Sequence, residues 1–186
     1  MENIYLSMIR PDMRNLPDLP LPPGYTMRLY RTGDEPLWID IVRSGEPFLD
    51  ITDDMFQKEF AHDMPSVERG MYFLAEPGGR EVGTTTIWPA RNLKGDGLDY
   101  GRVHWVAIHP DFQGRGLCKP MLSFILKKMA NCYERSVLGT SSGRLRALKC
   151  YLDFGFLPDM TWDRAREGWS EVKSVLKHPV LEAMRF

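Results

Sequence analysis

The stretch from residue 101 to 132 constrains the fold more than any other part of the chain. It opens with β-branched and aromatic residues at 103–108 and reaches Pro110, which cannot donate to a strand ladder. Gly114 and Gly116 follow, and after them apolar residues recur at helical spacing. The sequence therefore predicts a buried strand, a glycine turn and a helix in direct succession.

The glycine turn is expected to bind an anion. The first turn of a helix leaves backbone N–H groups without intrahelical partners and carries positive potential. Gly114 and Gly116 let the backbone approach a ligand without a Cβ in the way, and Arg115 and Lys119 add full charges. Pro120 lacks an N–H and fits only the first turn, so the helix should begin just after the glycines. A pyrophosphate is the anion that suits such a cradle.

Three known types of glycine loop have a sequence pattern close to this turn. A Walker A loop needs G-x-x-x-x-G-K-[ST], which the chain lacks, and the dinucleotide fingerprint G-x-G-x-x-G fails because Lys119 stands at its third glycine. The third type, Q-x-x-G-x-[G/A] after a strand ending in V-x-[I/V]-x-P, is matched by Gln113-x-x-Gly116-x-Cys118 after residues 106–110. These strings resemble the acetyl-CoA motif of the GNAT superfamily of N-acetyltransferases. Cys118 replaces the usual small residue and slightly crowds the approach to the pyrophosphate; an ordinary glycine turn is the alternative interpretation.

A second segment, residues 147–156, also resembles this superfamily. Its sequence, Ala-Leu-Lys-Cys-Tyr-Leu-Asp-Phe-Gly-Phe, is similar to the family's helix with A-x-x-x-Y followed by a Gly-Phe turn. Gly155 is well placed to end the helix, and Phe156 to start the next strand. The family often has Asn three positions before the motif's alanine, where this chain has Arg144. The recognisable resemblance covers residues 70–156.

The order of predicted elements indicates an α/β fold around a mixed sheet. The resemblance further implies a GNAT-type, mostly antiparallel central sheet flanked by helices, with two central strands that splay apart. One of these strands should end near Ile108 and the other near Thr140, and the pantetheine arm of acetyl-CoA, the expected cosubstrate, would lie between them. The resemblance assigns acetyl-CoA contacts to Val106, Ala107, Ile108, Gln113, Gly114, Arg115, Gly116, Leu117, Cys118 and Lys119.

Acyl transfer from a thioester to an amine needs a deprotonated amine, donors for the oxyanion and a proton for the thiolate. The resemblance offers Tyr151 as the proton donor, since a phenol of pKa about 10 is a fair match for a thiolate of pKa about 8–9. A core tyrosine on an amphipathic helix is the alternative. The backbone N–H of Ala107 or of its neighbour is the expected oxyanion donor.

His104 is the candidate base. Alternation along the strand predicts that it shares a face with Val106 and Ile108. Some members of the similar family, including arylalkylamine acetyltransferases, use a histidine at this strand position, and an unperturbed imidazole has a pKa near 6.5. A hydrogen-bonded structural histidine is the alternative, and Glu81 and Asp99 are the alternative bases.

Composition limits the classes of partner. Lys and Arg total 24 against 25 for Asp and Glu, a net charge of −1, so no nucleic-acid partner is expected. No apolar stretch approaches the ~18 residues of a membrane span, and no signal peptide is evident. The histidines outside the strand have no metal-ligand spacing, so no metal site is expected. An odd number of cysteines, at apolar positions, indicates the reducing cytoplasm.

The expected domain organisation is a proline-rich N-terminal arm, 1–24, and a single acetyl-CoA-binding acetyltransferase domain, 25–186. Residues 4–9 could form a short strand, but the prolines that follow favour an extended arm over the surface. A swapped arm in a homodimer is the alternative. Other expected elements are helices at 35–44, 52–60 (capped by Thr52) and 167–176, a hairpin of strands 71–75 and 82–88, a loop at 92–99 and a strand at 136–140.

The sequence therefore predicts an acyltransferase that moves an acetyl group from acetyl-CoA to a primary amine of a small molecule or peptide, by direct attack in a ternary complex. A cysteine relay is disfavoured because Cys118 and Cys150 have no histidine near them in sequence. The alternatives are an acyl-CoA-binding sensor domain without turnover and a transferase for a different acyl-CoA. The acceptor should contact residues 44–66, the 90–100 loop and the C-terminal segment.

Overall fold

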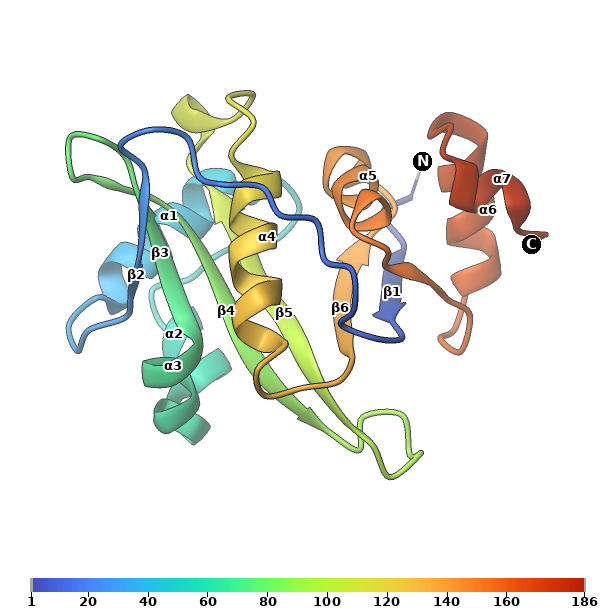
Figure 1. Cartoon of the computed structure of the whole chain (residues 1–186), viewed down its shortest axis with the longest axis horizontal. Coiled ribbons are helices and arrows are strands. Elements are labelled where there is room, and N and C mark those ends of the chain that lie inside the picture. The colour runs from blue at the N-terminus through green and yellow to red at the C-terminus, as the bar shows by residue number, and fades with distance from the viewer. Residues whose placement is uncertain (1, 186) are drawn as a thin grey trace.

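The computed structural model describes residues 2–185, which form a seven-stranded sheet with helices on both faces (Figure 1). The strand order is β2-β3-β4-β5-β6-β1-β7, and every neighbouring pair is antiparallel except β5 and β6. This arrangement confirms the predicted mixed, mostly antiparallel α/β fold. The strands are β1 (Tyr5–Arg10), β2 (Thr26–Leu29), β3 (Met71–Ala75), β4 (Glu81–Arg91), β5 (Asp99–Ile108), β6 (Ser136–Ser141) and β7 (Leu157–Asp159).

The helices cover the two faces of the sheet with separate cores. One core joins α4, α5 and α6 to the sheet and includes Leu126, Trp169 and Phe156; Figure 1 shows α4 crossing in front of β4 and β5. The other core joins α1, α2 and α3 to the opposite face through Trp38, Phe60 and neighbouring side chains. The helices are α1 (Glu35–Gly45), α2 (Met55–Phe60), η1 (Ala61–Asp63), α3 (Met64–Gly70), η2 (Pro110–Phe112), α4 (Cys118–Met129), α5 (Leu145–Asp153), α6 (Ala165–Val175) and α7 (Pro179–Ala183).

Strands β5 and β6 pair over only part of their length. Residues 101–103 of β5 pair in parallel with residues 136–138 of β6, and both strands then continue without pairing to Ile108 and Ser141. The predicted splay of the two central strands is therefore confirmed. The wedge between them, defined by residues 104–108 and 139–141, opens where the glycine turn and the start of α4 lie.

A β-bulge interrupts β5 at the start of the wedge. Trp105 has φ +48°, and the register with β4 shifts between Thr84 and Thr86. The extra residue turns His104 and Trp105 to the same face, where their rings pack against the α1–α2 core, whereas Val106 packs against the α4 core. The expectation that His104 and Val106 share a face is wrong, because alternation does not continue through a bulge.

The N-terminal segment forms the short strand that residues 4–9 were expected to allow, but it is not the surface arm predicted for residues 1–24. Residues 5–10 do not lie over the surface but form β1, which is inserted between β6 and β7. Its Leu6 and Met8 are fully buried in the α5–α6 core, and its Ser7 hydroxyl donates to Asp159 at 3.1 Å. The strand is interior because its alternate side chains complete both faces of the sheet.

Only residues 11–24 run as an extended segment of the kind predicted for an arm, and Figure 1 shows this segment passing over α4. Ser123 of α4 holds it, accepting from the Leu19 amide at 3.0 Å and donating to the Pro17 carbonyl at 2.7 Å.

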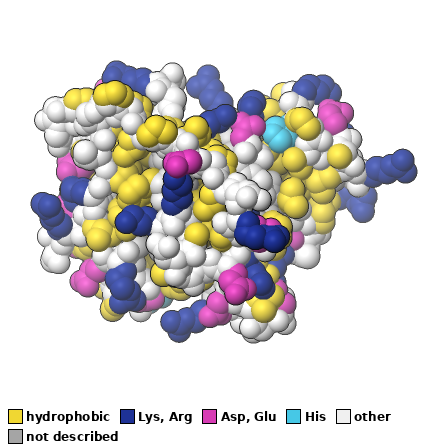
Figure 2. Space-filling view, viewed as in Figure 1, with side chains coloured by type: hydrophobic (Ala, Val, Ile, Leu, Met, Phe, Trp, Pro, Cys, Tyr) yellow, Lys and Arg dark blue, Asp and Glu magenta, His cyan; other side chains and the backbone are white. Residues whose placement is uncertain are grey.

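The remaining predicted elements agree with the structure within a few residues, including the C-terminal helix α6. The start of helix α2 is the exception, because its N-cap is Asp54 and not the predicted Thr52. The Thr52 hydroxyl donates to the Asp54 carboxylate instead. On the face that carries α4, acidic and basic side chains are interspersed (Figure 2). Within residues 2–185, none of the helices combines the length and the apolar character that crossing a membrane requires.

Candidate active site

The turn from Gln113 to Lys119 has the geometry of an open cradle. Gly114 and Gly116 have φ +75° and +74°, and a Cβ on either would meet no atom within 4 Å. None of the backbone amides from 114 to 119 donates a hydrogen bond to a residue in the described part of the chain. The start of α4 therefore presents several free N–H groups to solvent, beside glycines that leave room for a ligand.

The side chains of the turn mostly fasten it to the protein. The Gln113 amide donates to the Ile108 carbonyl at 2.9 Å, so the turn is fixed to the end of β5. Leu117 is buried in a small core with Leu74 and Met121. Arg115 donates to the Asp111 carbonyl at 2.8 Å. Its guanidinium also stacks on Phe112, with its central carbon 4.5 Å from the centre of the ring.

Lys119 pairs with Asp153 of α5 at 2.8 Å. Partial burial raises the pKa of Asp153, but hydrogen bonds from Lys119, Lys149 and His178 outweigh it and lower that pKa to about 2. Lys119 is therefore held to α5, so its predicted contact with acetyl-CoA stays a prediction.

Cys118 and Cys150 connect the first turn of α4 to α5. Their sulfur atoms lie 3.3 Å apart, and both thiols are free. The hydrogen bond between them lowers the pKa of Cys118 and raises that of Cys150.

The wedge exposes main-chain groups of β5. The His109 amide donates to the Val82 carbonyl at 2.8 Å, and the register pairs Ala107 with Thr84. Because main-chain groups alternate along a strand, the amides of Val106 and Ile108 point away from β4 and into the wedge. The Ala107 amide faces β4 instead, so of the donors that the sequence suggested only a neighbour of Ala107 points into the wedge.

Tyr151 projects from α5 into the α4-side core. It is 7% exposed, lies edge-on to Phe156 and shares the core with Val106 and Cys118. Burial raises its pKa. Its hydroxyl forms no hydrogen bond with any residue that the structure describes, and it is not among the side-chain oxygens that are both unpaired and closed off from solvent.

His104 lies on the other face, in an aromatic pocket. Phe60, Trp88 and Trp105 surround its ring, and its Nε2 lies 3.3 Å from a carboxylate oxygen of Glu59. Burial lowers the pKa of His104, and the Glu59 hydrogen bond only partly offsets this effect. His104 is therefore held in its neutral form at pH 7, with Glu59 fixing the ring.

Glu59 is the site residue that the sequence analysis missed. It also accepts from the Trp105 indole at 2.9 Å, so it contacts both residues of the bulge from α2. Glu59 matches no motif, and its role follows only from how α2 packs on β5. The alternative bases are elsewhere: Glu81 pairs with Arg28 of β2 at 2.7 Å, and Asp99 lies at the opposite end of β5 from the wedge.

The loop after α1 spans the end of the wedge. Gly45 lies against the Ile108 carbonyl, where a Cβ would come within 3.0 Å of the oxygen. Glu46 accepts from Arg144 at 2.7 and 2.9 Å, and Phe48 packs under the same guanidinium. Arg144 stands at the position where the resemblance suggested an asparagine, and it fastens this loop to the start of α5.

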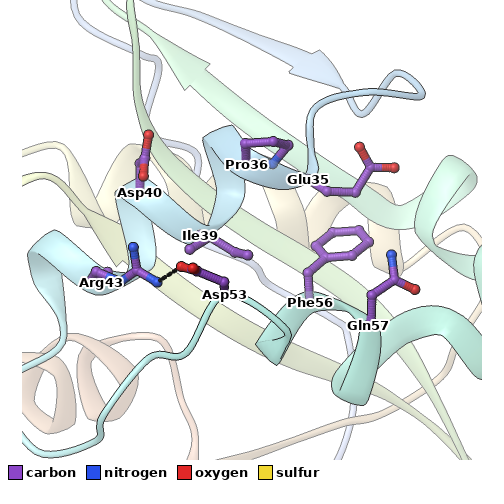
Figure 3. Close-up of a pocket in the computed structure, with 8 residues that line it drawn as sticks. All are labelled: Glu35, Pro36, Ile39, Asp40, Arg43, Asp53, Phe56 and Gln57. Atoms are coloured by element: carbon purple, nitrogen blue, oxygen red, sulfur yellow. Dashed lines mark hydrogen bonds and ion pairs between the residues drawn. The ribbon is translucent and has the colours of Figure 1, made fainter.

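Two surface hollows lie apart from the wedge. One, of about 290 Å³, is formed by α1 and α2, and Figure 3 shows the Arg43–Asp53 ion pair across it. The other, of about 590 Å³, lies between residues 11–14 and 130–135. Neither contains a predicted site residue.

A model of the acetyltransferase (GNAT) family matches residues 34–156 of the chain. Among solved structures, the chain is similar to a GCN5-related N-acetyltransferase from Sphaerobacter thermophilus (18% identity, TM-score 0.66, covering 84% of this chain and 49% of that one). It is also similar to an acetyltransferase from the GNAT family from Colwellia psychrerythraea (14% identity, TM-score 0.64, covering 84% of this chain and 53% of that one). A third similar structure is a GCN5-related N-acetyltransferase from Kribbella flavida (14% identity, TM-score 0.54, covering 85% of this chain and 55% of that one).

The chain thus spans about half the length of these structures, and their low identity shows a common fold alone. No curated protein matches the sequence.

Proposed function

Because the chain belongs to the acetyltransferase (GNAT) family, we propose that it transfers an acetyl group from acetyl-CoA to a primary amine of a small molecule or peptide. The observation that carries this proposal is the joint arrangement of the wedge and the cradle. Free amides at 114–119 suit a pyrophosphate, and the amides of Val106 and Ile108 suit the pantetheine arm that would lead into the wedge. The bound thioester would supply the activated acetyl group.

The residues around the wedge divide the proton chemistry between the two faces of the sheet. On the α1–α2 face, burial lowers the pKa of His104, so its imidazole is unprotonated and can accept the proton of the amine. On the α4–α5 face, the unpaired hydroxyl of Tyr151 can give a proton to the thiolate. The Val106 amide, between them, can donate to the oxyanion. The amine would then approach from one face while the thiol leaves on the other, in a ternary complex.

This activity is tested by following free thiol release from acetyl-CoA with a panel of primary amines. Release that depends on an amine supports the proposal. Acetyl-CoA binding in calorimetry without release on any acceptor would support a sensor domain instead. Comparing acetyl-, succinyl- and longer-chain donors distinguishes a transferase for another acyl group.

Gly116→Asp tests the cradle. The substitution puts a Cβ and a negative charge beside the free amides, so acetyl-CoA affinity should collapse. Gly95→Asp is the matched control. Gly95 also has a positive φ and open space around it, but it lies in the 92–98 loop far from the cradle. Equal affinity in a folded Gly116→Asp protein would remove the cradle assignment.

We also propose a cytoplasmic location, which suits the three free cysteines.

A further inference from the structure

The α1–α2 face of the sheet carries an unpaired guanidinium beside the candidate base. Arg102 lies two residues before His104 on β5, in register with Trp88 of β4 and Val137 of β6. It is half-buried, yet among residues 2–185 it has no ion-pair or hydrogen-bond partner. A half-buried guanidinium without a protein partner keeps its N–H donors available for a ligand.

The acidic groups on this face already have partners. Glu59 is held by His104 and the Trp105 indole. Asp159 of β7 pairs with Lys94 at 2.6 Å and also accepts from the Ser7 and Thr161 hydroxyls. None of the ion pairs or hydrogen bonds among the described residues uses the N–H donors of Arg102, although its charge lowers the pKa of the Glu59 carboxyl; an anionic group is the ligand that such free donors suit.

An aromatic pair from the N-terminal and C-terminal parts of the chain borders the same face. Tyr5 of β1 extends across β6 at Gly139, where a Cβ would come within 2.7 Å of the Tyr5 hydroxyl. The last β5–β6 pair is Val103 with Leu138, so His104 and Gly139 are the first wedge residues of their strands. Trp162 packs edge-on against Tyr5 at 5.3 Å, and both rings remain more than 40% exposed.

These groups are close enough to influence one another. Burial raises the pKa of Tyr5, and the charge of Arg102 opposes that rise. The charge of Arg102 also lowers the pKa of His104, in the same direction as burial does. The Cα atoms of Arg102 and His104 are roughly 7 Å apart along an extended strand, so one small molecule can reach both.

We propose that the acceptor is an amine that also carries a carboxylate or phosphate, that Arg102 binds this anionic group, and that Tyr5 and Trp162 flank it. The inference rests on the proposed function and adds the chemical class of the acceptor. A guanidinium suits both groups, because its planar N–H fork binds either with two parallel hydrogen bonds. The anionic group would hold the molecule so that its amine lies at His104.

The test compares acceptors that differ only in the anionic group. Thiol release is measured with β-alanine against β-alaninamide and with phosphoethanolamine against ethanolamine, for the wild type and for Arg102→Gln. We expect the wild type to prefer the anionic member of at least one pair. Arg102→Gln should lower kcat/KM for that member about 10- to 100-fold more than for the neutral member, which loses only the effect of the Arg102 charge on His104. Arg166→Gln, an exposed arginine on α6, is the control that should change neither.

Binding of the same acceptors is measured in parallel by calorimetry with acetyl-CoA present. If no acceptor turns over but the anionic members bind in an Arg102-dependent way, the proposed activity falls and the anion site stands. Equal preference for both members of each pair, or a preference that survives Arg102→Gln, overturns the inference. Arg102→Lys replaces the Gln variant if the latter does not fold; it keeps the charge and loses the fork.

Discussion

Gly155→Ala should destabilise the protein more than its own backbone strain explains. Gly155 follows α5 with φ +75° and closes it, since the Phe156 amide donates to the Tyr151 carbonyl at 3.1 Å. Alanine in this left-handed conformation costs about 1–2 kcal/mol. Its Cβ would also overlap the Arg10 guanidinium, which donates to the Phe154 carbonyl from β1. Loss of that buried hydrogen bond adds about 1–3 kcal/mol.

The expected total is about 2–5 kcal/mol, measured as the change in unfolding free energy in equilibrium urea titrations. Gly95→Ala is the matched control. It has φ +69° in the 92–98 loop and open space around it, so it should cost only the strain of about 1–2 kcal/mol. Equal losses in the two variants would refute the contribution of Arg10 and with it the role assigned to β1 in holding the turn after α5.

The other predictions concern the site. Tyr151→Phe should lower turnover by about 10²–10⁴ with little change in unfolding free energy, because the hydroxyl has no hydrogen bond to lose; full turnover would make Tyr151 a core residue only. His104→Gln should lower kcat/KM and remove the acidic limb of the pH–rate profile, and an unchanged limb would exclude His104 as the base. Burial lowers the pKa of His104, so the unfolded state binds the imidazole proton more readily than the folded state does. The wild-type free energy of unfolding should therefore fall as the pH drops below 6.5. Urea midpoints across this range should fall less steeply in His104→Gln, and parallel slopes would contradict the assigned shift. Diamide should oxidise Cys118 and Cys150 to a disulfide, detected as a loss of two hydrogen masses, because their sulfur atoms lie 3.3 Å apart; Cys118→Ser should prevent this, and a wild type that stays reduced would contradict the contact.

Local patterns predicted the parts of the fold that depend on local chemistry. The strand, glycine turn and start of α4 follow from Pro110, Gly114 and Gly116, and the amphipathic spacing of residues 167–176 gave helix α6. The splay at Ile108 was implied by the family resemblance and not by periodicity. In each of these cases the signal lies within a few consecutive residues.

The errors arose where distant segments decide the outcome. The bulge at Trp105 depends on β4 and α2, so alternation placed His104 on the wrong face. Residues 5–10 carry no local sign that their partners are β6 and β7. Glu59 contacts His104 only because α2 packs across β5, and Arg102 has significance only after its neighbours are known to be paired.

The position of β1 also sets the order in which the chain can fold. The Ser7–Asp159 hydrogen bond joins residues separated by 152 positions, and β7 pairs only with β1 among the described strands. Closing so long a loop adds little equilibrium cost, since each doubling of length costs about 0.6 kcal/mol, but contacts of such high separation form slowly. During synthesis β1 emerges before β6 and β7 and must wait for both of them. Until then Leu6 and Met8 lie in an unpaired apolar strand, which is the kind of segment that a chaperone would have to protect.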